Sequence, residues 1–264
     1  MSQPRREIRP RFEGVSETLL ITLAARASAP RLHPDLAFDD PHAREYAREI
    51  GFDPRRFTRD IVTMRGVIRR ARLLDDRVRT FLARHPGARV IALGAGLDTR
   101  FQRVDDGRVR WTDVDLPPVV ETLRRLVAPH PRHRLQEGSI EDGEWLAGLD
   151  DDGPVLVIVE GVLMYLRHGD VRRFFVRTGR ALPAGSELLF DFIHPAMALL
   201  GRVHPSVRKT RSRFRWGLRS LRTIERWAPE WGVEERVHYM PRFGRVVGVA
   251  RLRAGARRTG PGRR

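Results

Sequence analysis

The sequence of 264 residues contains no cysteine. This absence excludes disulfide bonds, thiolate zinc sites and a cysteine nucleophile, and leaves the nine histidines as candidate ligands or bases. No apolar run approaches the roughly 20 residues needed to span a bilayer, and the N-terminal residues MSQPRREIRP lack the apolar stretch of a secretion signal. We therefore expect a cytoplasmic protein with no membrane partner and no bound metal ion.

Lysine is nearly absent as well. Lys209 is the one lysine among 50 basic residues, which face 33 acidic residues and give a net charge of +17. Such an excess attracts nucleic acid or other anions. Because the arginines are dispersed, apart from the tail that follows Arg251, we interpret them as a compositional bias and expect nucleic acid not to be the main partner. The sequence does not indicate an oligomeric state.

The spacing of apolar residues divides the chain into regions. In the N-terminal region, apolar residues recur at the spacing of a helix. Short β-branched runs then alternate with helical stretches, which is typical of parallel strands with crossover helices. The length favours a single domain. We expect one domain over 1–264, with a helical N-terminal cap (16–82), a cofactor-binding core (89–193), a helical insert (195–231), closing strands (232–253) and a disordered basic tail (254–264).

A glycine loop follows the first expected strand. Val90 to Leu93 form an apolar run, and Gly94-Ala95-Gly96 comes directly after it. Glycines at such a turn let the backbone approach a ligand closely. An acidic residue about 20 positions later commonly binds ribose hydroxyls, and Asp115 lies 21 positions after Gly94. The pattern indicates a cofactor that carries a nucleoside.

The loop differs from that of a dinucleotide site. A dinucleotide fold carries a third glycine for the pyrophosphate, whereas Thr99 stands three positions after Gly96. Asp98 adds a negative charge at the entrance of the next helix, which disfavours a phosphate. The cationic, phosphate-free S-adenosylmethionine suits this loop better than NAD does.

Longer stretches of the sequence resemble one family. Five segments occur in the order and spacing of the leucine carboxyl methyltransferase family. They are ETLLITLAARA (17–27), DDPHA (39–43), LGAGLDTRF (93–101), DVDLPPVVE (113–121) and EGVLMYL (160–166). The sequence is similar to the bacterial branch of that family, which includes polyketide O-methyltransferases. The resemblance implies a Rossmann-like class I methyltransferase: an α/β fold with a mostly parallel seven-stranded sheet, an antiparallel terminal strand, N-terminal helices and a helical insert after strand five.

The resemblance also implies roles for residues of the cofactor site. Gly94, Ala95 and Gly96 would lie against the methionyl moiety. Asp115 would accept hydrogen bonds from the ribose hydroxyls, with Asp113 as the alternative.

In the same family, an arginine before the glycine loop grips the methionyl carboxylate. Arg70 matches it, and Arg69 and Arg72 are the alternatives in this arginine-rich stretch. A guanidinium suits that task because it can bind a carboxylate through two parallel hydrogen bonds.

Two further positions complete the predicted site. Many relatives have Asp-Leu after strand three, where the carboxylate contacts the adenine amino group, whereas this chain has Ser139-Ile140. The adenine contact would be weaker or would run through Glu141. Glu160 ends an aliphatic strand and needs a partner to offset its desolvation. The family places it beside the methionyl amino group, and the alternative is a pair with an arginine of the helical cap.

No residue is assigned as a catalytic base. His194, His33 and His238 are candidates, while Met164 and Tyr165 are candidate lining residues of a reaction chamber. We expect an S-adenosylmethionine-dependent O-methyltransferase that acts on a hydroxyl or carboxyl of a small molecule, in particular a polyketide-like secondary metabolite. An RNA-directed methyltransferase and a non-catalytic cofactor-binding module are the alternatives.

Overall fold

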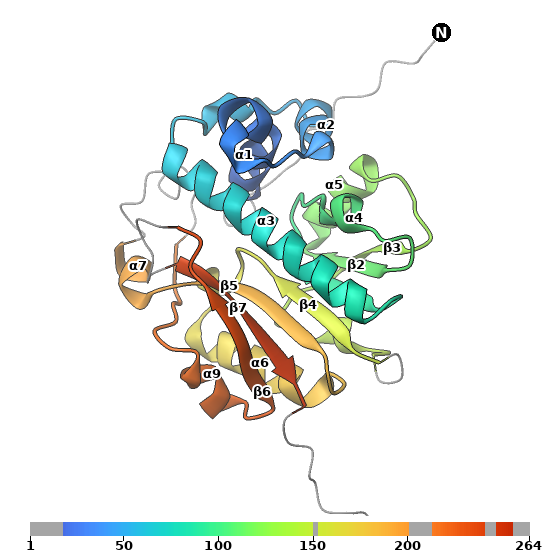
Figure 1. The fold of residues 1–264 in the computed structure, drawn as a ribbon, viewed down its shortest axis with the longest axis vertical. Helices are drawn as coiled ribbons and strands as arrows, with labels where there is room; N and C mark the ends of the chain where they lie inside the picture. Colours follow the sequence, from blue (N-terminus) through green and yellow to red (C-terminus); the bar gives the residue numbers. More distant parts are fainter. Residues whose placement is uncertain (1–17, 150–152, 201–212, 241–246, 256–264) are drawn as a thin grey trace, which may run out of the picture.

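The computed structural model describes residues 18–149, 153–200, 213–240 and 247–255 (Figure 1). Its centre is a seven-stranded sheet in the order β3-β2-β1-β4-β5-β7-β6. The strands are β1 (Arg89–Leu93), β2 (Arg110–Asp115), β3 (His133–Glu137), β4 (Val155–Val159), β5 (Glu187–Ile193), β6 (Trp231–Val237) and β7 (Val247–Ala254). The first five strands pair in parallel, whereas β7 is antiparallel to both β5 and β6. The predicted fold class is confirmed.

Helices cover both faces of this sheet. The α-helices are α1 (Leu19–Leu32), α2 (Pro41–Glu49), α3 (Ile61–Arg84), α4 (Arg100–Val104), α5 (Pro117–Leu126), α6 (His168–Ala181), α7 (Pro195–Leu200) and α9 (Arg222–Trp227). Short 3-10 turns are η2 (Pro34–Leu36), η3 (Pro54–Arg56), η4 (Glu144–Leu146) and η5 (Leu163–Tyr165). Figure 1 shows α3 running along the sheet, with α1 and α2 at one end of it.

Successive side chains of each strand point to opposite faces of the sheet, which divides the core into two layers. Val90 and Ala92 of β1 point to the face covered by α3 and α4, whereas Ile91 and Leu93 point to the face covered by α6 and α9. All residues of β4 and β5 are buried, as expected for central strands of a sheet covered on both sides. The carboxyl ends of the parallel strands therefore meet at one edge, beneath α1.

The expectation of a helical insert over 195–231 is correct only in part. The structure has α7 and α9 there, but residues 213–221 precede α9 without forming an α-helix. The backbone N–H of Leu218 donates to the carbonyl of Ile193 at the end of β5 (2.7 Å), and that of Arg215 donates to the carbonyl of Met164 in η5 (2.7 Å). The segment thus bonds to other elements instead of forming helical turns. Residues 201–212 lie outside the described residues.

The predicted closing strands form the β6 and β7 pair, and β7 lies between β5 and β6. The predicted basic tail (254–264) begins too early, because Ala254 is the last residue of β7, and residues 256–264 lie outside the described residues. Within the described residues, no helix is long and apolar enough to cross a membrane.

Candidate cofactor site

A cavity of about 310 Å³ opens at the carboxyl ends of the parallel strands. Its walls come from α1, from α3 and from the loops that follow β1 to β4. The cavity brings together all eight residues that the sequence analysis names as a cofactor site: Arg70, Gly94, Ala95, Gly96, Asp115, Ser139, Ile140 and Glu160. Residues far apart in the sequence thus line one site, at the position where open α/β sheets bind ligands.

The glycine loop between β1 and α4 needs both of its glycines. Gly94 and Gly96 have φ angles of 63° and 60°, in the left-handed region that favours glycine. A Cβ on Gly94 would lie 2.4 Å from Cγ2 of Val162, too close for two carbon atoms. The N–H of Gly94 donates to the carbonyl of Val114 (2.8 Å), which holds the loop against β2.

Asp115 at the end of β2 is attached to this loop. Its Oδ2 accepts from the N–H of Gly96 and its Oδ1 accepts from the N–H of Leu116, both at 2.7 Å. Burial raises the pKa of Asp115 to about 6, although these two hydrogen bonds lower it. A carboxylate has about four lone-pair positions, so Asp115 retains acceptor capacity at the wall of the cavity.

Asp113, the alternative to Asp115, does not line the cavity. Its Oδ1 accepts from Nε1 of Trp111 and its Oδ2 is hydrogen-bonded to Nε2 of His133, both at 2.7 Å. Asp113 is 4% exposed and is therefore a structural residue of the core. The geometry favours Asp115 as the carboxylate that meets a ligand.

Leu116 and the residues after β3 line the cavity beside Asp115. Ile140 is buried there, and Leu116 lies at the wall with 49% of its surface exposed. The Ser139 hydroxyl accepts from the N–H of Glu141 (3.1 Å), and both residues line the cavity. Burial and the nearby Asp170 raise the pKa of Glu141. Sequence reasoning missed Leu116, although it stands directly after Asp115.

Arg70 is held between two carboxylates. Its Nε donates to Oε1 of Glu160 (2.7 Å) and its Nη1 donates to Oδ2 of Asp191 (2.6 Å). Nη2 of Arg100 donates to the other oxygen of Glu160 (2.6 Å). Burial opposes ionisation of Glu160, but Arg70 and Arg100 bring its pKa below the ordinary value. Glu160 thus makes the arginine pairs that the sequence analysis gave as its alternative, and its contact with an amino group stays a prediction.

Asp98 is also neutralised within the protein. Its Oδ1 lies 2.8 Å from Nη1 of Arg26, and its Oδ2 lies 2.6 Å from Nη1 of Arg100. Burial would raise the pKa of Asp98, but these two arginines and Arg103 hold it well below its usual range. Partners from α1 and α4 therefore compensate the charge of Asp98, which weakens the electrostatic part of the argument against a phosphate, and that argument stays a prediction.

These pairs belong to one buried group that we call the ionic network. It consists of Arg26, Arg70, Arg100 and Arg103 with Asp40, Asp75, Asp98, Glu160 and Asp191. Arg26 also donates from Nη2 to the carbonyl of Leu97 (2.6 Å), which ties α1 to the glycine loop. Sequence reasoning missed Arg26, Arg100 and Asp191, because only the fold brings α1, α4 and β5 together.

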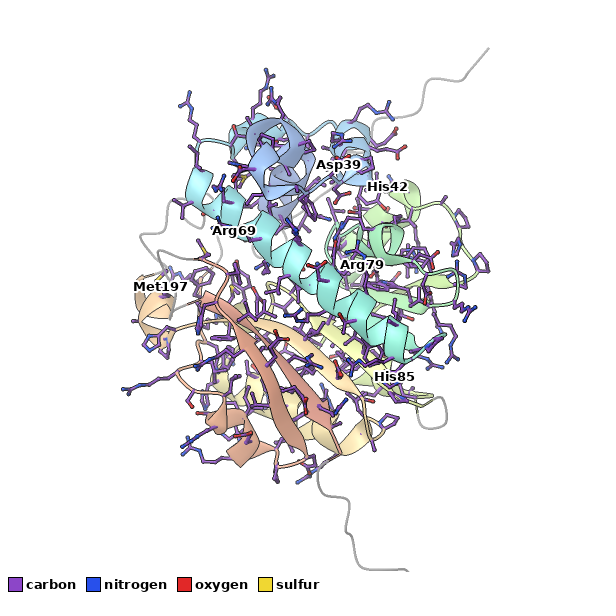
Figure 2. The ribbon with its side chains drawn as sticks, viewed as in Figure 1. Asp39, His42, Arg69, Arg79, His85 and Met197 are labelled. Carbon is purple, nitrogen blue, oxygen red and sulfur yellow. The ribbon has the colours of Figure 1, made fainter. Side chains whose placement is uncertain are left out.

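The two alternatives to Arg70 lie elsewhere. Neither Arg69 nor Arg72 lines the cavity, and Nη1 of Arg72 donates to the carbonyl of Leu36 (2.8 Å). Figure 2 shows Arg69 on α3. Helical periodicity explains the difference, because consecutive residues of α3 point in different directions.

The three candidate histidines also lie away from the cavity walls. Nδ1 of His194 accepts from the N–H of Ala196 (3.2 Å), and the ring of His238 packs edge-on against Phe192, with centroids 6.0 Å apart. His33 is buried beside Arg65, and burial lowers its pKa. Among the described residues, no group of His, Asp and Glu is arranged to hold a metal ion.

Comparison with known proteins identifies relatives along most of the chain. The family model for leucine carboxyl methyltransferases matches residues 19–178. The tetracenomycin polyketide synthesis O-methyltransferase TcmP of Streptomyces glaucescens is 37% identical over 227 residues, which cover 86% of this chain and 83% of the relative. The S-adenosyl-L-methionine-dependent methyltransferase dpfgK of Gibberella zeae is 30% identical over 256 residues, with 88% and 85% covered.

Solved structures share the fold at low sequence identity. A crystal structure from Thermobifida fusca aligns with a TM-score of 0.59 and 19% identity, covering 94% of this chain and 96% of the other. The N-methyltransferase NodS from Bradyrhizobium japonicum, solved in complex with S-adenosyl-L-homocysteine, aligns with a TM-score of 0.50 and 17% identity, covering 92% and 99%. At these identities the likeness concerns the fold alone.

Proposed function

Because this chain belongs to the leucine carboxyl methyltransferase family and is an S-adenosylmethionine-dependent methyltransferase, we propose that it methylates an oxygen atom of a small molecule. The acceptor oxygen belongs to a hydroxyl or carboxyl group, and the molecule is polyketide-like. The observation that carries this proposal is the 37% identity, over 86% of the chain, to a relative whose name states polyketide O-methylation.

The cavity has the chemistry that the cofactor requires. Asp115 accepts hydrogen bonds and would bind the ribose hydroxyls beside Gly96. Leu116 and Ile140 offer apolar surface to the adenine, and Ser139 offers a hydroxyl to its polar edge. Small-molecule sites typically combine apolar walls with a few placed polar groups.

We assign the methionyl end to Arg70 because its Nη2 lies next to the cavity wall, and because each Nη carries two N–H groups, so that its interactions with Glu160, Asp191 and Tyr239 leave a donor for a carboxylate. Arg26 and Arg100 use all three of their guanidinium nitrogens within the protein. Nη2 of Arg70 lies 3.6 Å from the position that a Cβ on Gly161 would occupy, next to the cavity wall. Arg70 would therefore bind the methionyl carboxylate, and Glu160 the amino group.

Catalysis on this proposal rests on positioning. The bound cofactor supplies an activated sulfonium methyl group, so that a C–O bond to the acceptor forms as the C–S bond breaks. The protein holds the cofactor between Asp115 and Arg70 and aligns the acceptor oxygen. Alignment of this kind can contribute about 7–11 kcal/mol to lowering a barrier. A carboxylate acceptor needs no base, whereas a hydroxyl acceptor has to lose a proton.

The test uses S-adenosylmethionine with a labelled methyl group, incubated with the protein and a small-molecule extract of the host. Mass spectrometry should detect a small molecule that gains one labelled methyl group, and hydrolysis of the product should identify an ester or an ether. The Asp115→Ala variant is the matched control and should transfer much less label at limiting cofactor. Label found on RNA, or cofactor binding with no transfer to any fraction, would overturn the proposal.

A further inference from the structure

The loop that follows β3 forms one wall of the cofactor cavity. We call residues 138–143 the β3 loop. The residues of this loop that line the cavity are Ser139, Ile140 and Glu141, besides Gly138 at its start. The N–H of Gly138 donates to the carbonyl of Asp115 (3.0 Å), which ties the start of the loop to the end of β2. The position of the rest of the loop therefore decides which surface the cavity offers to a base.

Arg177 of α6 holds the β3 loop from outside the cavity, which it does not line. Its Nη1 donates to the carbonyl of Glu141 and its Nη2 donates to the carbonyl of Ile140, both at 2.7 Å. A guanidinium presents its N–H groups in a rigid planar fork. Two donors on two consecutive carbonyls therefore fix the orientation of this part of the loop.

The helix that carries Arg177 is itself anchored in the core. Phe174, one turn before Arg177, is buried, and its ring packs against that of Trp145 in η4, with centroids 6.3 Å apart. Ile140 belongs to the same core cluster as both of these residues. Arg177 thus connects the β3 loop to a helix that the core holds in place.

The position of Arg177 is unfavourable for the guanidinium itself. Burial lowers the pKa of Arg177, and its Nε is buried without a hydrogen-bond partner among the described residues. An unsatisfied buried donor is uncommon in native structures and calls for an explanation. A methionine would cover the same surface of α6 without this cost, so the two carbonyl contacts are what the arginine contributes.

Gly143, at the end of the β3 loop, makes room for this guanidinium. A Cβ at this position would lie 2.7 Å from Cζ and from Nη1 of Arg177. Any other residue here would therefore displace the guanidinium from the two carbonyls. The φ angle of Gly143 is 80°, in the left-handed region that favours glycine.

We propose that Arg177 is a positioning residue for the cofactor: by holding the carbonyls of Ile140 and Glu141, it aligns the β3 loop with the adenine base. Ser139 and Ile140 offer the base a hydroxyl and an apolar surface, and the contribution of such contacts depends on how closely supporting residues fix their placement. This inference rests on the proposed placement of the adenine beside Ser139 and Ile140, and it does not depend on the methyl acceptor.

The first test compares ligands that differ in the base. S-Adenosylhomocysteine and 5′-methylthioadenosine contain adenine, whereas S-ribosylhomocysteine keeps the ribose and the amino acid portion without it. In calorimetric titrations, Arg177→Met should weaken the two adenine ligands about tenfold each and leave S-ribosylhomocysteine within about twofold. Unchanged affinities would overturn the proposal. An equal loss for all three ligands would also overturn it, because a general disturbance of the fold does not depend on the base.

Arg180→Met is the matched control on α6. Arg180 lies one turn after Arg177, with its side chain 73% exposed and its Nε 3.8 Å from Oε1 of Glu230. This variant also removes one positive charge from α6, and it should leave all three affinities unchanged. A loss equal to that of Arg177→Met would assign the effect to charge and overturn the role of the two carbonyl contacts.

The second test displaces the guanidinium without removing it. Gly143→Ala should weaken S-adenosylhomocysteine about as much as Arg177→Met does. The double variant should lose no more affinity than either single variant, since both changes remove the same contacts. Losses that add up in the double variant would contradict the proposal.

Gly148→Ala is the control for backbone strain. Gly148 has a φ angle of 72°, close to that of Gly143, but among the described residues no atom beyond its chain neighbours lies within 4 Å of a Cβ added there. Its affinity for S-adenosylhomocysteine should equal that of the wild type. A loss as large as in Gly143→Ala would show that strain, and not displacement of Arg177, causes the effect.

The proposed function and this inference can fail separately, because these tests measure binding and not transfer. Transfer of label to a small molecule, with unchanged affinities in Arg177→Met, would leave O-methylation standing and overturn the role of Arg177. Affinities that depend on Arg177, with no transfer of label to any small molecule, would support the role of Arg177 and overturn O-methylation alone.

Discussion

The two ends of this active-site region are built by opposite means. At the methionyl end, the ionic network fixes each charged group through several partners, as when Glu160 receives a guanidinium on each oxygen. Next to the cavity, Tyr165 packs in an apolar group that we call the aromatic-methionine cluster; it consists of Met164, Ile193, Tyr165, Met197, Phe214, Tyr239 and Met240. The first arrangement holds each charged side chain through several ion pairs, which suits a cofactor of constant structure. The second can adapt its shape, because methionine side chains rotate and pack against irregular surfaces.

Substitutions in the ionic network and in the aromatic-methionine cluster should also differ in their cost to stability. Burying charges is costly, and a buried pair stabilises a fold only when its geometry and additional hydrogen bonds offset the desolvation. In the ionic network Arg100 is 2% exposed and meets Asp75, Asp98 and Glu160 at 2.6–2.7 Å. Removing Arg100 leaves these buried carboxylates with fewer positive charges to offset their desolvation. A truncated side chain in the apolar cluster leaves only an unfilled space.

The largest expected effect breaks the ionic network. Arg100→Met should lower the free energy of unfolding by about 3–5 kcal/mol, because Asp75, Asp98 and Glu160 each lose one of their buried arginine partners. Urea unfolding followed by circular dichroism measures this change. Arg79→Met is the control: Arg79 lies on α3 with its side chain 51% exposed, in a surface pair with Asp76 (Figure 2), and should cost about 1 kcal/mol or less. Equal losses in the two variants would contradict a stabilising network.

The next effect separates two neighbouring carboxylates. Asp115→Ala should weaken S-adenosylhomocysteine by about 1.5–3 kcal/mol, the range for a hydrogen bond to a charged group, with little loss of stability. Asp113→Ala should do the reverse, because it leaves Trp111 and His133 without their acceptor. Calorimetry and thermal unfolding of both variants give the comparison. If Asp113→Ala lost affinity for S-adenosylhomocysteine at unchanged stability, Asp113 would be the ligand contact and the present assignment of Asp115 would be wrong.

A smaller effect tests the point where the ionic network meets the cofactor. Glu160→Gln should weaken S-adenosylhomocysteine about tenfold more than 5′-methylthioadenosine, which keeps the nucleoside but lacks the amino acid portion. Glu141→Gln removes the same charge at the other end of the cavity and should not discriminate between the two ligands. If Glu160→Gln weakened both equally, its assignment to the amino group would be wrong.

The smallest effect concerns pH. Hydrogen bonds from ribose hydroxyls favour the ionised form of Asp115, whose pKa burial raises from 3.8 to about 6. Affinity for S-adenosylhomocysteine should therefore fall about tenfold as the pH decreases from 7 to 5. The contribution of Asp115 to stability has the opposite sign: the folded protein holds this proton more tightly than the unfolded chain, so that contribution declines as the pH rises from 3.8 to about 6.

Asp115→Asn, which cannot titrate, is the control for this pH series. Its affinity should be lower at neutral pH and nearly independent of pH between 5 and 7. A wild-type affinity that does not change over this interval would show that Asp115 is not the carboxylate beneath the ribose.

Much of the cofactor site is predictable from local sequence. Strands such as Glu187–Ile193 are recognisable from apolar runs, and the glycine loop is recognisable because Gly94 and Gly96 occupy backbone conformations that other residues avoid. Asp115 follows from its spacing to that loop. Residues 213–221 were expected to be helical, because their periodicity resembles that of a helix. In the structure their backbone N–H groups donate instead to Met164 in η5 and to Ile193 at the end of β5.

By itself the sequence determined which functional residues follow which strand. A glycine turn follows the first strand, Asp115 ends the second, and Glu160 follows the fourth. These are local properties, set by backbone conformation and by residue type at the end of a strand. Only the tertiary structure decided which arginine meets which carboxylate, because Arg26, Arg70 and Arg100 come from three helices. The aromatic-methionine cluster is likewise assembled by the fold, since side chains distant in sequence contact one another only when the sheet and helices pack.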